Sequence, residues 1–336
     1  MEELKNFKPI DLYEKLRLSD NDFDAWLEKL GLLHGKRTCY KCGGRTGINV
    51  MKNERYGCWR CTTRNCREKQ GYLCGTFFEG THLTTKKVFH LSYLWAYRLG
   101  TYDYIEFATG ISRHAIVDWM SFFRDICAEN FVKNEILIGG EGKEKELILI
   151  VIFNLGIEVE VDETVVVRRK YERGRQPSKK DVWMIGGVER NTKHEKCFLA
   201  IIEGKRSAEN LIPIIQHHIL PGTTIYTDLW RAYGSIPKLP EQYIHATINH
   251  SKEYVDSEDP NVHTQNIESL WSTYKRKFRH QAGNNTGTYK SYLPEFLWRK
   301  RFGNIENVFY NFWHHVSLFY PCKMWKGKFD GRKGKI

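Results

Sequence analysis

The chain has 336 residues, with 52 lysines and arginines against 40 aspartates and glutamates, a formal charge of +12 and an isoelectric point near 9.1. A basic surface attracts polyphosphates such as nucleic acid, although a basic protein without that role has the same composition. This length allows one sizeable core with one or two small modules, and since no apolar run reaches the roughly 18–20 residues of a membrane span, we expect no membrane partner.

Residues 1–34 are the first predicted segment. The opening sequence MEELKNFKPIDLYEKL contains acids and lacks the apolar region of a signal peptide, so we expect a protein that is not secreted. The run LYEKLRLSDNDFDAWLEKLGLL predicts two short amphipathic helices, with Ser19 or Asp20 as a cap.

Six of the nine cysteines fall within 36 positions. An odd number of cysteines in an intracellular chain favours metal ligation and free thiols over disulfides. Cys39 and Cys42 are two residues apart and followed by two glycines, which is typical of a zinc knuckle. The second pair is open, since Cys58 with Cys61 has the commoner spacing and Cys61 with Cys66 is wider.

A structural zinc site explains how so short a segment folds. Residues 36–76 are too polar to bury enough apolar surface unless a metal holds them. Four thiolates leave no open coordination position, so the predicted Zn²⁺ is structural and not catalytic. The alternative is a set of buried thiols without metal.

The next part of the chain is predicted to be helical. Residues 84–100 carry apolar side chains near a 3.6-residue period and end at a glycine. A helix, a turn at Gly110 and a second helix beginning at Ser112 follow, which is the order of a helix-turn-helix. The first residues of the second helix, Ser112, Arg113 and His114, would then read bases. A plain helical bundle with a glycine turn has the same pattern and remains an alternative.

From about residue 145 the pattern changes to strands, after the linker GGEGKEKE at 139–146. Near-continuous apolar strands of this kind are typical of an α/β layer covered by helices. In chain order we predict strands at 147–153, 157–162, 182–188 and 197–202, a helix at 207–219, a strand at 223–228, a short helix at 230–234, a strand at 243–249 and a helix at 263–280.

Three acidic residues stand out in this region. Asp162 and Asp228 each end an apolar strand, and Glu268 lies near the start of a helix whose Trp271 and Lys275 follow on one face. Carboxylates that converge from two strand ends and a helix suit Mg²⁺, which takes oxygen ligands. Two such ions about 4 Å apart clamp the attacking and leaving oxygens of a phosphoryl transfer. Any one acid alone could be an ordinary surface or capping residue.

The surroundings of these acids resemble one known family. The segments are VEVDETVVVRRKYERGR at 159–175, VWMIGGVER at 182–190, HHILPGTTIYTDLWRAY at 217–233 and VDSEDPNVHTQNIESLWSTYKRKFR at 255–279. They are similar to the Merlin-type cut-and-paste DDE transposases and their bacterial insertion-sequence relatives, over about residues 36–310. The last segment is the most specific. After Thr164 the chain has three valines, where relatives tend to have an aromatic residue and a glycine.

The resemblance implies a ribonuclease-H-like fold, in which the strands of the first two acids lie side by side. It implies a catalytic triad of Asp162, Asp228 and Glu268 that binds two Mg²⁺ or Mn²⁺ ions, with Lys275 as a basic partner. It also favours one particular zinc set. That set is Cys39, Cys42, Cys61 and Cys66, with Cys58 as the substitute.

The function implied is a DNA transposase. It would bind terminal inverted repeats, cleave DNA at the element ends and join the 3′-hydroxyl ends to target DNA. Its partners would be double-stranded DNA and further copies of the chain, as a homodimer or higher oligomer. We expect it in the nucleus if the source is eukaryotic and otherwise in the cytoplasm or nucleoid. The alternatives are a hydrolytic nuclease of the same fold and a host-adopted DNA-binding protein.

Basic residues flank the acids in the sequence. We predict that they contact DNA phosphates, although each cluster could be a solvated face, the reading we prefer for the basic tail. His263 is placed to orient phosphate, but a hydrogen-bonded structural histidine is the simpler interpretation. The predicted DNA-binding residues of this kind are Arg168, Arg169, Lys170, Arg173 and Arg175 in a hairpin and Lys275, Arg276 and Arg279 on the Glu268 helix.

The predicted domains follow from these features. They are an N-terminal helical segment (1–34), a zinc ribbon (35–80), a helix-turn-helix-like region (82–138), an α/β catalytic domain of ribonuclease-H-like fold (145–315), which is a mixed sheet with flanking helices, and a basic tail (316–336).

Overall fold

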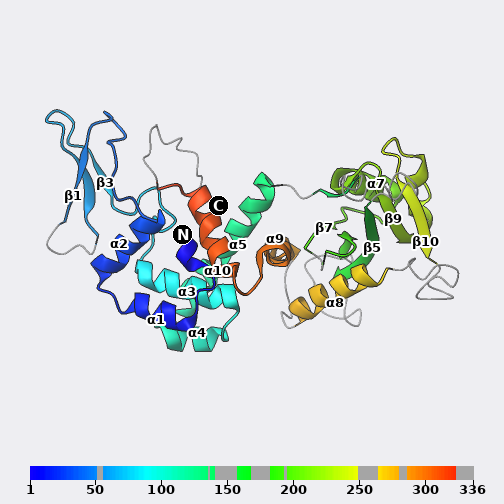
Figure 1. Ribbon diagram of the computed structural model, residues 1–336, viewed down its shortest axis with the longest axis horizontal. Helices are drawn as coiled ribbons and strands as arrows, with labels where there is room; N and C mark the ends of the chain where they lie inside the picture. Colours follow the sequence, from blue (N-terminus) through cyan, green and yellow to red (C-terminus); the bar gives the residue numbers. More distant parts are fainter. Residues whose placement is uncertain are drawn as a thin grey trace. The chain divides into compact units, whose positions relative to one another are not determined.

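The chain forms two compact units. The computed structural model describes residues 1–50, 56–134, 137–140, 157–167, 182–192, 195–248, 264–279 and 286–322. One unit comprises Met1–Ile126 together with the chain from Phe302 onward, and the other comprises Cys127–Arg301 (Figure 1). The strand predicted at 147–153 and most of the linker before it lie outside the described residues.

The first unit is mainly helical. Ser19 caps α2 (Asp20–Leu30) by accepting a hydrogen bond from the Asp22 backbone N–H at 3.1 Å. A glycine in the left-handed conformation, Gly110 with φ +60°, ends α4 (Tyr102–Thr109). The elements are η1 (Glu2–Leu4), α1 (Pro9–Leu16), α2 (Asp20–Leu30), α3 (Thr85–Tyr97), α4 (Tyr102–Thr109), the first part of α5 (Arg113–Lys133) and α10 (Val308–Phe319).

An aromatic core joins the two ends of the chain in this unit. Phe89 of α3 packs against Phe309 and Trp313 of α10, with ring centroids 5.1 and 5.4 Å apart. All three side chains are fully buried. Residues up to 315 were assigned to the catalytic domain from the sequence, whereas α10 groups with the first unit because its apolar face completes this core.

A small antiparallel sheet follows α2 in the same unit. Its order is β1–β2–β3, and the strands are β1 (Thr46–Asn49), β2 (Cys58–Cys61) and β3 (Lys69–Gly71).

The second unit is built on a mixed sheet of five strands in the order β10–β9–β5–β6–β7. β5, β6 and β7 run antiparallel to one another, while β9 and β10 run parallel to β5. The strands are β5 (Glu158–Val167), β6 (Val182–Glu189), β7 (Cys197–Ile201), β9 (Thr224–Asp228) and β10 (Ile244–Ile248), and β4 (Ile138–Gly139) pairs separately with β8 (Ile219–Leu220).

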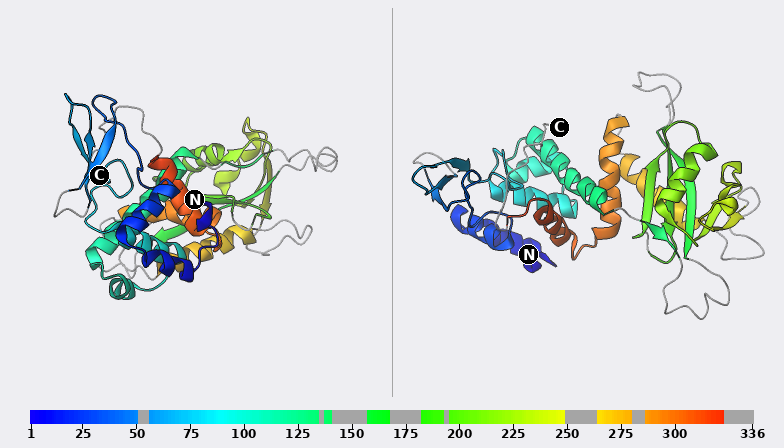
Figure 2. Two further views of the ribbon diagram at one scale, coloured as in Figure 1. Left: turned by 60° about the vertical axis from the view of Figure 1, so that its left-hand side comes forward. Right: turned by 90° about the horizontal axis from the view of Figure 1, so that it is seen from above.

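Helices cover both faces of this sheet, as Figures 1 and 2 show. On one face Val161 and Ile225 of the sheet pack with Leu211 of α7 (Ala208–His218). On the other face Met184 packs with Trp271 of α8 (Gln265–Arg279), and α9 (Thr286–Phe302) adds to that core. The short helices η3 (Arg231–Tyr233) and η4 (Ile236–Lys238) follow β9. The predicted mixed sheet with flanking helices is therefore confirmed.

No helix in the part of the chain that the structure describes is both long enough and apolar enough to cross a membrane.

Candidate active site and cysteine cluster

Two of the predicted catalytic acids meet because of the register between β5 and β9. These strands pair Glu158 with Thr224, an offset of 66 residues that is kept along the ladder. The last printed pair is Glu160 with Tyr226, and continuing the same offset by two residues (228 − 162 = 66) sets Asp162 level with Asp228 on the neighbouring strand. Their proximity also follows from the charge of Asp228, which raises the pKa of Asp162. Residues at one level of parallel strands point to the same face of the sheet. The rest of β9 is buried and Asp228 is its first partly exposed residue, so this pair lies where the sheet reaches solvent.

The third acid comes from the first turn of α8. Glu268 is exposed, and its negative charge raises the pKa of Asp162. One helical turn later, Trp271 Nε1 donates a hydrogen bond of 3.0 Å to Oδ2 of Asp162. This bond joins the helix of the third acid directly to the strand of the first, and the structure thus brings the three acids together.

A glycine in β6 makes room for that tryptophan. Gly186 pairs with Asp162 across the antiparallel strands. A Cβ at Gly186 would lie 2.9 Å from Cη2 of Trp271 and 2.6 Å from Cδ2 of Leu199. Such distances are closer than packed atoms allow. The absence of a side chain at Gly186 therefore leaves the space that the indole occupies when it donates to Asp162.

Like charges and burial perturb the acids on β5. Burial, with the charges of Asp228 and Glu268, raises the pKa of Asp162 to about 6, although the Glu163 backbone N–H and the Trp271 indole act in the opposite direction. Glu163 is the next residue and points to the other face of the sheet. Burial and the charge of Asp162 raise the pKa of Glu163 to about 7.

This arrangement fits a divalent cation. Three carboxylates interact through repulsion, and the structure gives Asp162 one side-chain hydrogen-bond donor, Trp271. A cation would relieve that repulsion, and carboxylate oxygens are the ligands that Mg²⁺ and Mn²⁺ prefer. The acids are less tightly gathered than the cysteines, which are the one group among the described residues with three or more potential ligand atoms all within 4.8 Å of one another.

That group of four cysteines lies at one end of the small sheet. Cys39 and Cys42 come from the turn before β1, and Cys61 and Cys66 from the end of β2 and the turn after it. The Sγ atoms of Cys39 and Cys66 are 3.6 Å apart, and those of Cys42 and Cys61 are 3.5 Å apart. A tetrahedral zinc with Zn–S distances of about 2.3 Å has S–S edges of about 3.8 Å. Cys58, three residues earlier in β2, is not in the group.

The thiols of this cluster influence one another. Hydrogen bonds from the Gly44 backbone N–H and the Cys61 thiol lower the pKa of Cys42 to about 6. The Glu68 backbone N–H lowers the pKa of Cys66, but burial and the neighbouring thiols outweigh it and raise that pKa to about 12. One thiolate is therefore favoured and further ionisation is opposed unless a cation is bound, which is the behaviour of a metal-ligating set.

The residues predicted to read bases lie where α5 begins. Ser112, Arg113 and His114 are all exposed, and α5 starts one residue later than predicted. The Arg113 guanidinium forms an ion pair with Asp103 of α4 and lies 5.5 Å from the Tyr102 ring centroid. Exposed ion pairs are weak, so the guanidinium can exchange Asp103 for another acceptor.

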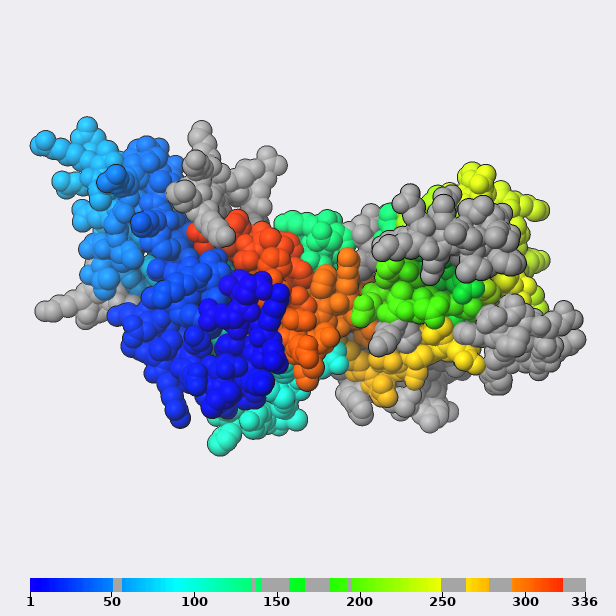
Figure 3. Space-filling model, viewed as in Figure 1, coloured from blue at the N-terminus to red at the C-terminus, as the bar shows by residue number. Residues whose placement is uncertain are grey.

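Only some of the residues predicted to contact phosphates lie in the part of the chain that the structure describes. Lys275 and Arg276 are exposed on α8, which lies at the surface in Figure 3 (gold), and Arg279 is the last residue of that helix. Outside the described residues lie His263 and the hairpin set of Arg168, Arg169, Lys170, Arg173 and Arg175.

Several residues at the site were not predicted from the sequence. Trp230 donates its backbone N–H to Oδ1 of Asp228 at 3.0 Å, and its side chain is exposed. Glu160 and Arg190 form a buried ion pair with 2.9 Å between Oε1 and Nε. The available signal for Glu160 was its position, because it alternates with the valines of β5 and lies two residues before Asp162.

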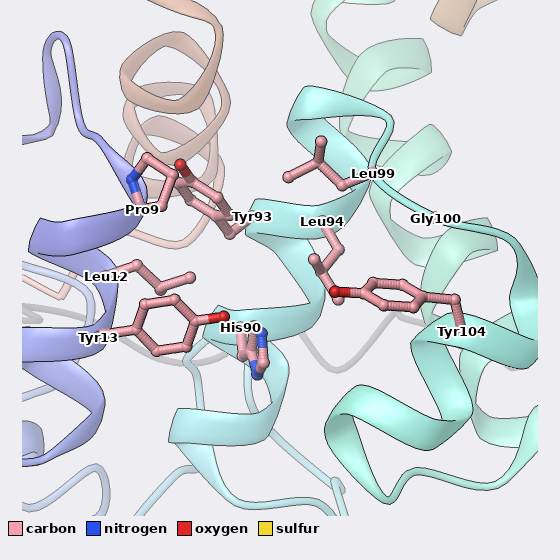
Figure 4. A pocket seen from close by; sticks show the side chains of 9 residues that line it. All are labelled: Pro9, Leu12, Tyr13, His90, Tyr93, Leu94, Leu99, Gly100 and Tyr104. Carbon is pink, nitrogen blue, oxygen red and sulfur yellow. The ribbon is translucent and has the colours of Figure 1, made fainter.

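The first unit contains an open pocket that is separate from these acids. It has a volume of about 340 Å³ and lies among α1, α3 and the start of α4 (Figure 4). Its lining is mostly tyrosine and leucine, with His90 on one side, and none of the predicted site residues contributes to it.

Comparisons with known proteins bear on the second unit. Residues 154–301 match the family described as the ISXO2-like transposase domain. An uncharacterized transposase-like protein of Haemophilus influenzae is 28% identical over 111 residues, which are 33% of this chain and 84% of that protein. The crystal structure of a pre-cleavage Mos1 transpososome aligns with 68% of this chain and 77% of its own at 10% identity, with a TM-score of 0.25, below the level at which a shared fold follows. The matched residues include all three acids, and the resemblance to DDE transposases is confirmed.

Proposed function

Because residues 154–301 form a DDE-type transposase domain, we propose that the protein is a DNA transposase of the cut-and-paste kind. It binds the terminal inverted repeats of its element, cleaves DNA at the element ends and joins the 3′-hydroxyl ends to target DNA. In this proposal it acts as a homodimer or higher oligomer on DNA, in the nucleus of a eukaryotic cell or in a bacterial nucleoid.

The observation that carries this proposal is the convergence of the three acids. The β5–β9 register sets Asp162 beside Asp228, and the Trp271 hydrogen bond ties the Glu268 helix to the same place. The sheet order and directions are also those expected of a ribonuclease-H-like fold, which supports that assignment.

The chain's own residues account for the positioning that phosphoryl transfer requires. When bound by Asp162, Asp228 and Glu268, two Mg²⁺ or Mn²⁺ ions supply activation of the attacking oxygen and neutralisation of the leaving oxygen. Trp271 fixes the orientation of the Asp162 carboxylate. Lys275 is seven residues after Glu268 on the same side of α8, where an exposed ammonium attracts the phosphate backbone.

The first unit is proposed to recognise DNA. The S–S distances and the small sheet support a zinc ribbon held by Cys39, Cys42, Cys61 and Cys66. The left-handed glycine between α4 and α5 and the exposed residues after it support a helix-turn-helix reader.

The test is a cleavage and strand-transfer assay, with DNA that flanks the gene at its own locus and Mg²⁺ or Mn²⁺. We expect Asp162→Asn, Asp228→Asn and Glu268→Gln each to abolish cleavage while leaving DNA binding near that of the wild type. Each change removes a metal-ligating charge but leaves the basic surface intact. Glu209→Gln, an exposed carboxylate on α7, is the matched control and should cleave normally.

Two outcomes would change the proposal. Cleavage above a few per cent in any of the three variants contradicts the role of that acid. Wild-type protein that cuts DNA but never joins it to a target favours the second candidate, a nuclease that uses the same acids.

A further inference from the structure

One carboxylate in the second unit is fully buried and accepts hydrogen bonds from both α8 and Arg190. Glu160 lies in β5 with no exposed surface. Its Oε2 accepts from the backbone N–H groups of Asn266 and Ile267 at 2.8 and 3.0 Å. Its Oε1 accepts from Asn266 Nδ2 at 2.8 Å and from Arg190 Nε at 2.9 Å.

The first two bonds cap a helix from outside its own chain segment. The first N–H groups of an α-helix have no partner within the helix, and a side chain just before the helix usually accepts from them. Here Glu160, 106 residues away in the sequence, accepts from Asn266, the second residue of α8. The negative charge also interacts favourably with the positive end of the helix dipole.

An arginine compensates this buried negative charge within the sheet. Arg190 has a side chain only 6% exposed and pairs with both Glu160 and Glu158. Its guanidinium lies 3.8 Å from the ring centroid of Tyr226 on β9. Because a buried carboxylate without a cation is strongly unfavourable, the Arg190 guanidinium compensates the Glu160 carboxylate where it contacts α8.

The contact between Glu160 and α8 lies next to two of the candidate catalytic acids. Glu160 is two residues before Asp162 on the same face of β5, since side chains alternate along a strand. The capped Ile267 immediately precedes Glu268. The contact therefore joins the strand of the first acid to the helical turn of the third, on the far side of Glu268 from the Trp271 bond.

We propose that Glu160 is a positioning residue, which anchors the first turn of α8 on β5 and thereby fixes Glu268 against Asp162. Arg190 acts through Glu160 by holding its charge. This inference rests on the proposed function, because a position for Glu268 matters only if the acids act together.

The deciding variant is Glu160→Gln. The amide keeps the size of the side chain, but its NH₂ group must face a donor, either Asn266 or Arg190, so the anchor loses at least one bond and its charge. Glu158→Gln is the matched control, because Glu158 shares Arg190 and the same face of β5 but, among the described residues, has no hydrogen bond to α8. Both are tested in the full chain with the flanking-DNA substrate.

Two readouts separate positioning from a merely structural role. Amide hydrogen exchange at residues 266–268 should become at least about tenfold faster in Glu160→Gln and stay unchanged in Glu158→Gln. The kcat for cleavage should fall by about 100-fold in Glu160→Gln with KM for DNA within about threefold, since a misplacement of about 1 Å has that effect on rate. Glu158→Gln should keep kcat within about threefold.

The outcomes are distinguishable from failure of the proposed function. Faster exchange with normal cleavage overturns the positioning role, and so does unchanged exchange with a lost kcat. Wild-type protein that does not cleave at all overturns the proposed function. In that case, faster exchange in Glu160→Gln but not in Glu158→Gln would still support the anchor. If Glu160→Gln does not fold, Asn266→Asp sets a carboxylate against Glu160 from the partly exposed helix side, and the same changes are expected there.

Discussion

At the scale of single residues, the candidate site depends on what lies directly against the Asp162 carboxylate. Its oxygen accepts from the Trp271 indole, and Asp228 and Glu268 bring two further negative charges close to it. Gly186 has no side chain, and this leaves the space that the Trp271 indole occupies beside Asp162. Both features lead to predictions about stability that can be tested without the DNA substrate.

Gly186→Ala should displace Trp271 from Asp162. The added methyl group meets two side chains at less than 3 Å, so the helix must shift or the indole must rotate. We expect a loss of about 1–3 kcal/mol in unfolding free energy, as for other overpacked cores, together with loss of cleavage. Denaturant unfolding measures the first effect.

The control for that prediction is Gly47→Ala in β1, where a Cβ meets no atom within 4 Å. It should change the unfolding free energy by no more than about 0.5 kcal/mol. A Gly186→Ala protein with wild-type stability and cleavage would show that the indole does not need the space.

The raised pKa of Asp162 predicts a pH-dependent stability in metal-free protein. The pKa is 3.8 in the absence of structure and about 6 in the folded protein, so the folded state favours the protonated acid. This stabilisation is fully present below pH 3.8 and is lost as the pH rises through 6. A shift of about two units corresponds to at most about 3 kcal/mol.

Denaturant unfolding of wild-type and Asp162→Asn protein at several pH values tests this. Wild-type stability should fall relative to the variant between pH 4 and 7, and added Mg²⁺ should reduce the difference at pH 7. A difference that is independent of pH would mean that Asp162 ionises as an ordinary exposed acid.

At the scale of elements, the small sheet is the part that depends most on a ligand. β1, β2 and β3 contribute few buried side chains, and the four Sγ atoms join the two turns that flank β1 and β2. We predict one zinc per chain, measured by elemental analysis. Cys39→Ser should lose the zinc and the fold of residues 36–76, and should weaken recognition of the element ends, whereas Cys58→Ser should retain all three.

A well-folded protein that contains no zinc would refute the metal site and leave four free thiols. Chelation offers an independent check, because it should unfold the small sheet in the wild type without any substitution.

The junction of α4 and α5 leads to a prediction about specificity. Base contacts confer specificity, while phosphate contacts only position the DNA. Arg113→Ala should therefore weaken binding to the correct terminal repeat by about 1–3 kcal/mol and leave random DNA nearly unaffected. Lys275→Ala should weaken both equally and reduce the salt dependence by about one phosphate contact.

Competition binding at two salt concentrations measures both effects. Asp103→Asn is the matched control, since it releases Arg113 from its ion pair and should not reduce specific binding. An unchanged ratio of specific to random affinity in Arg113→Ala would leave α4 and α5 as a structural bundle.

At the scale of the whole molecule, the sequence predicts features that are local along the chain. The Cys39–Cys42 spacing and the apolar runs before Asp162 and Asp228 depend on neighbouring residues, and the structure has the cysteines in a cluster and a strand that ends at Asp228. The predicted strand end at Asp162 is wrong, because β5 continues to Val167. It could not predict contacts that arise only when distant elements dock. Glu160 reaches Asn266 across 106 residues, and nothing near either residue indicates the other.

The same reason explains the assignment of the C-terminal helix. The apolar face of α10 predicts burial, but the sequence does not indicate against which partner. Its place beside α3 follows from the shapes of Phe309 and Trp313 against Phe89, which are properties of the assembled core.

That location of α10 has a consequence for synthesis in the cell. The second unit is an insertion within the first, because the chain leaves the first unit after Ile126 and returns to it at Phe302. A ribosome must therefore translate the entire insertion before the aromatic core around Phe89 can close. A nascent or prematurely terminated chain that lacks α10 would therefore lack the closed core of the first unit.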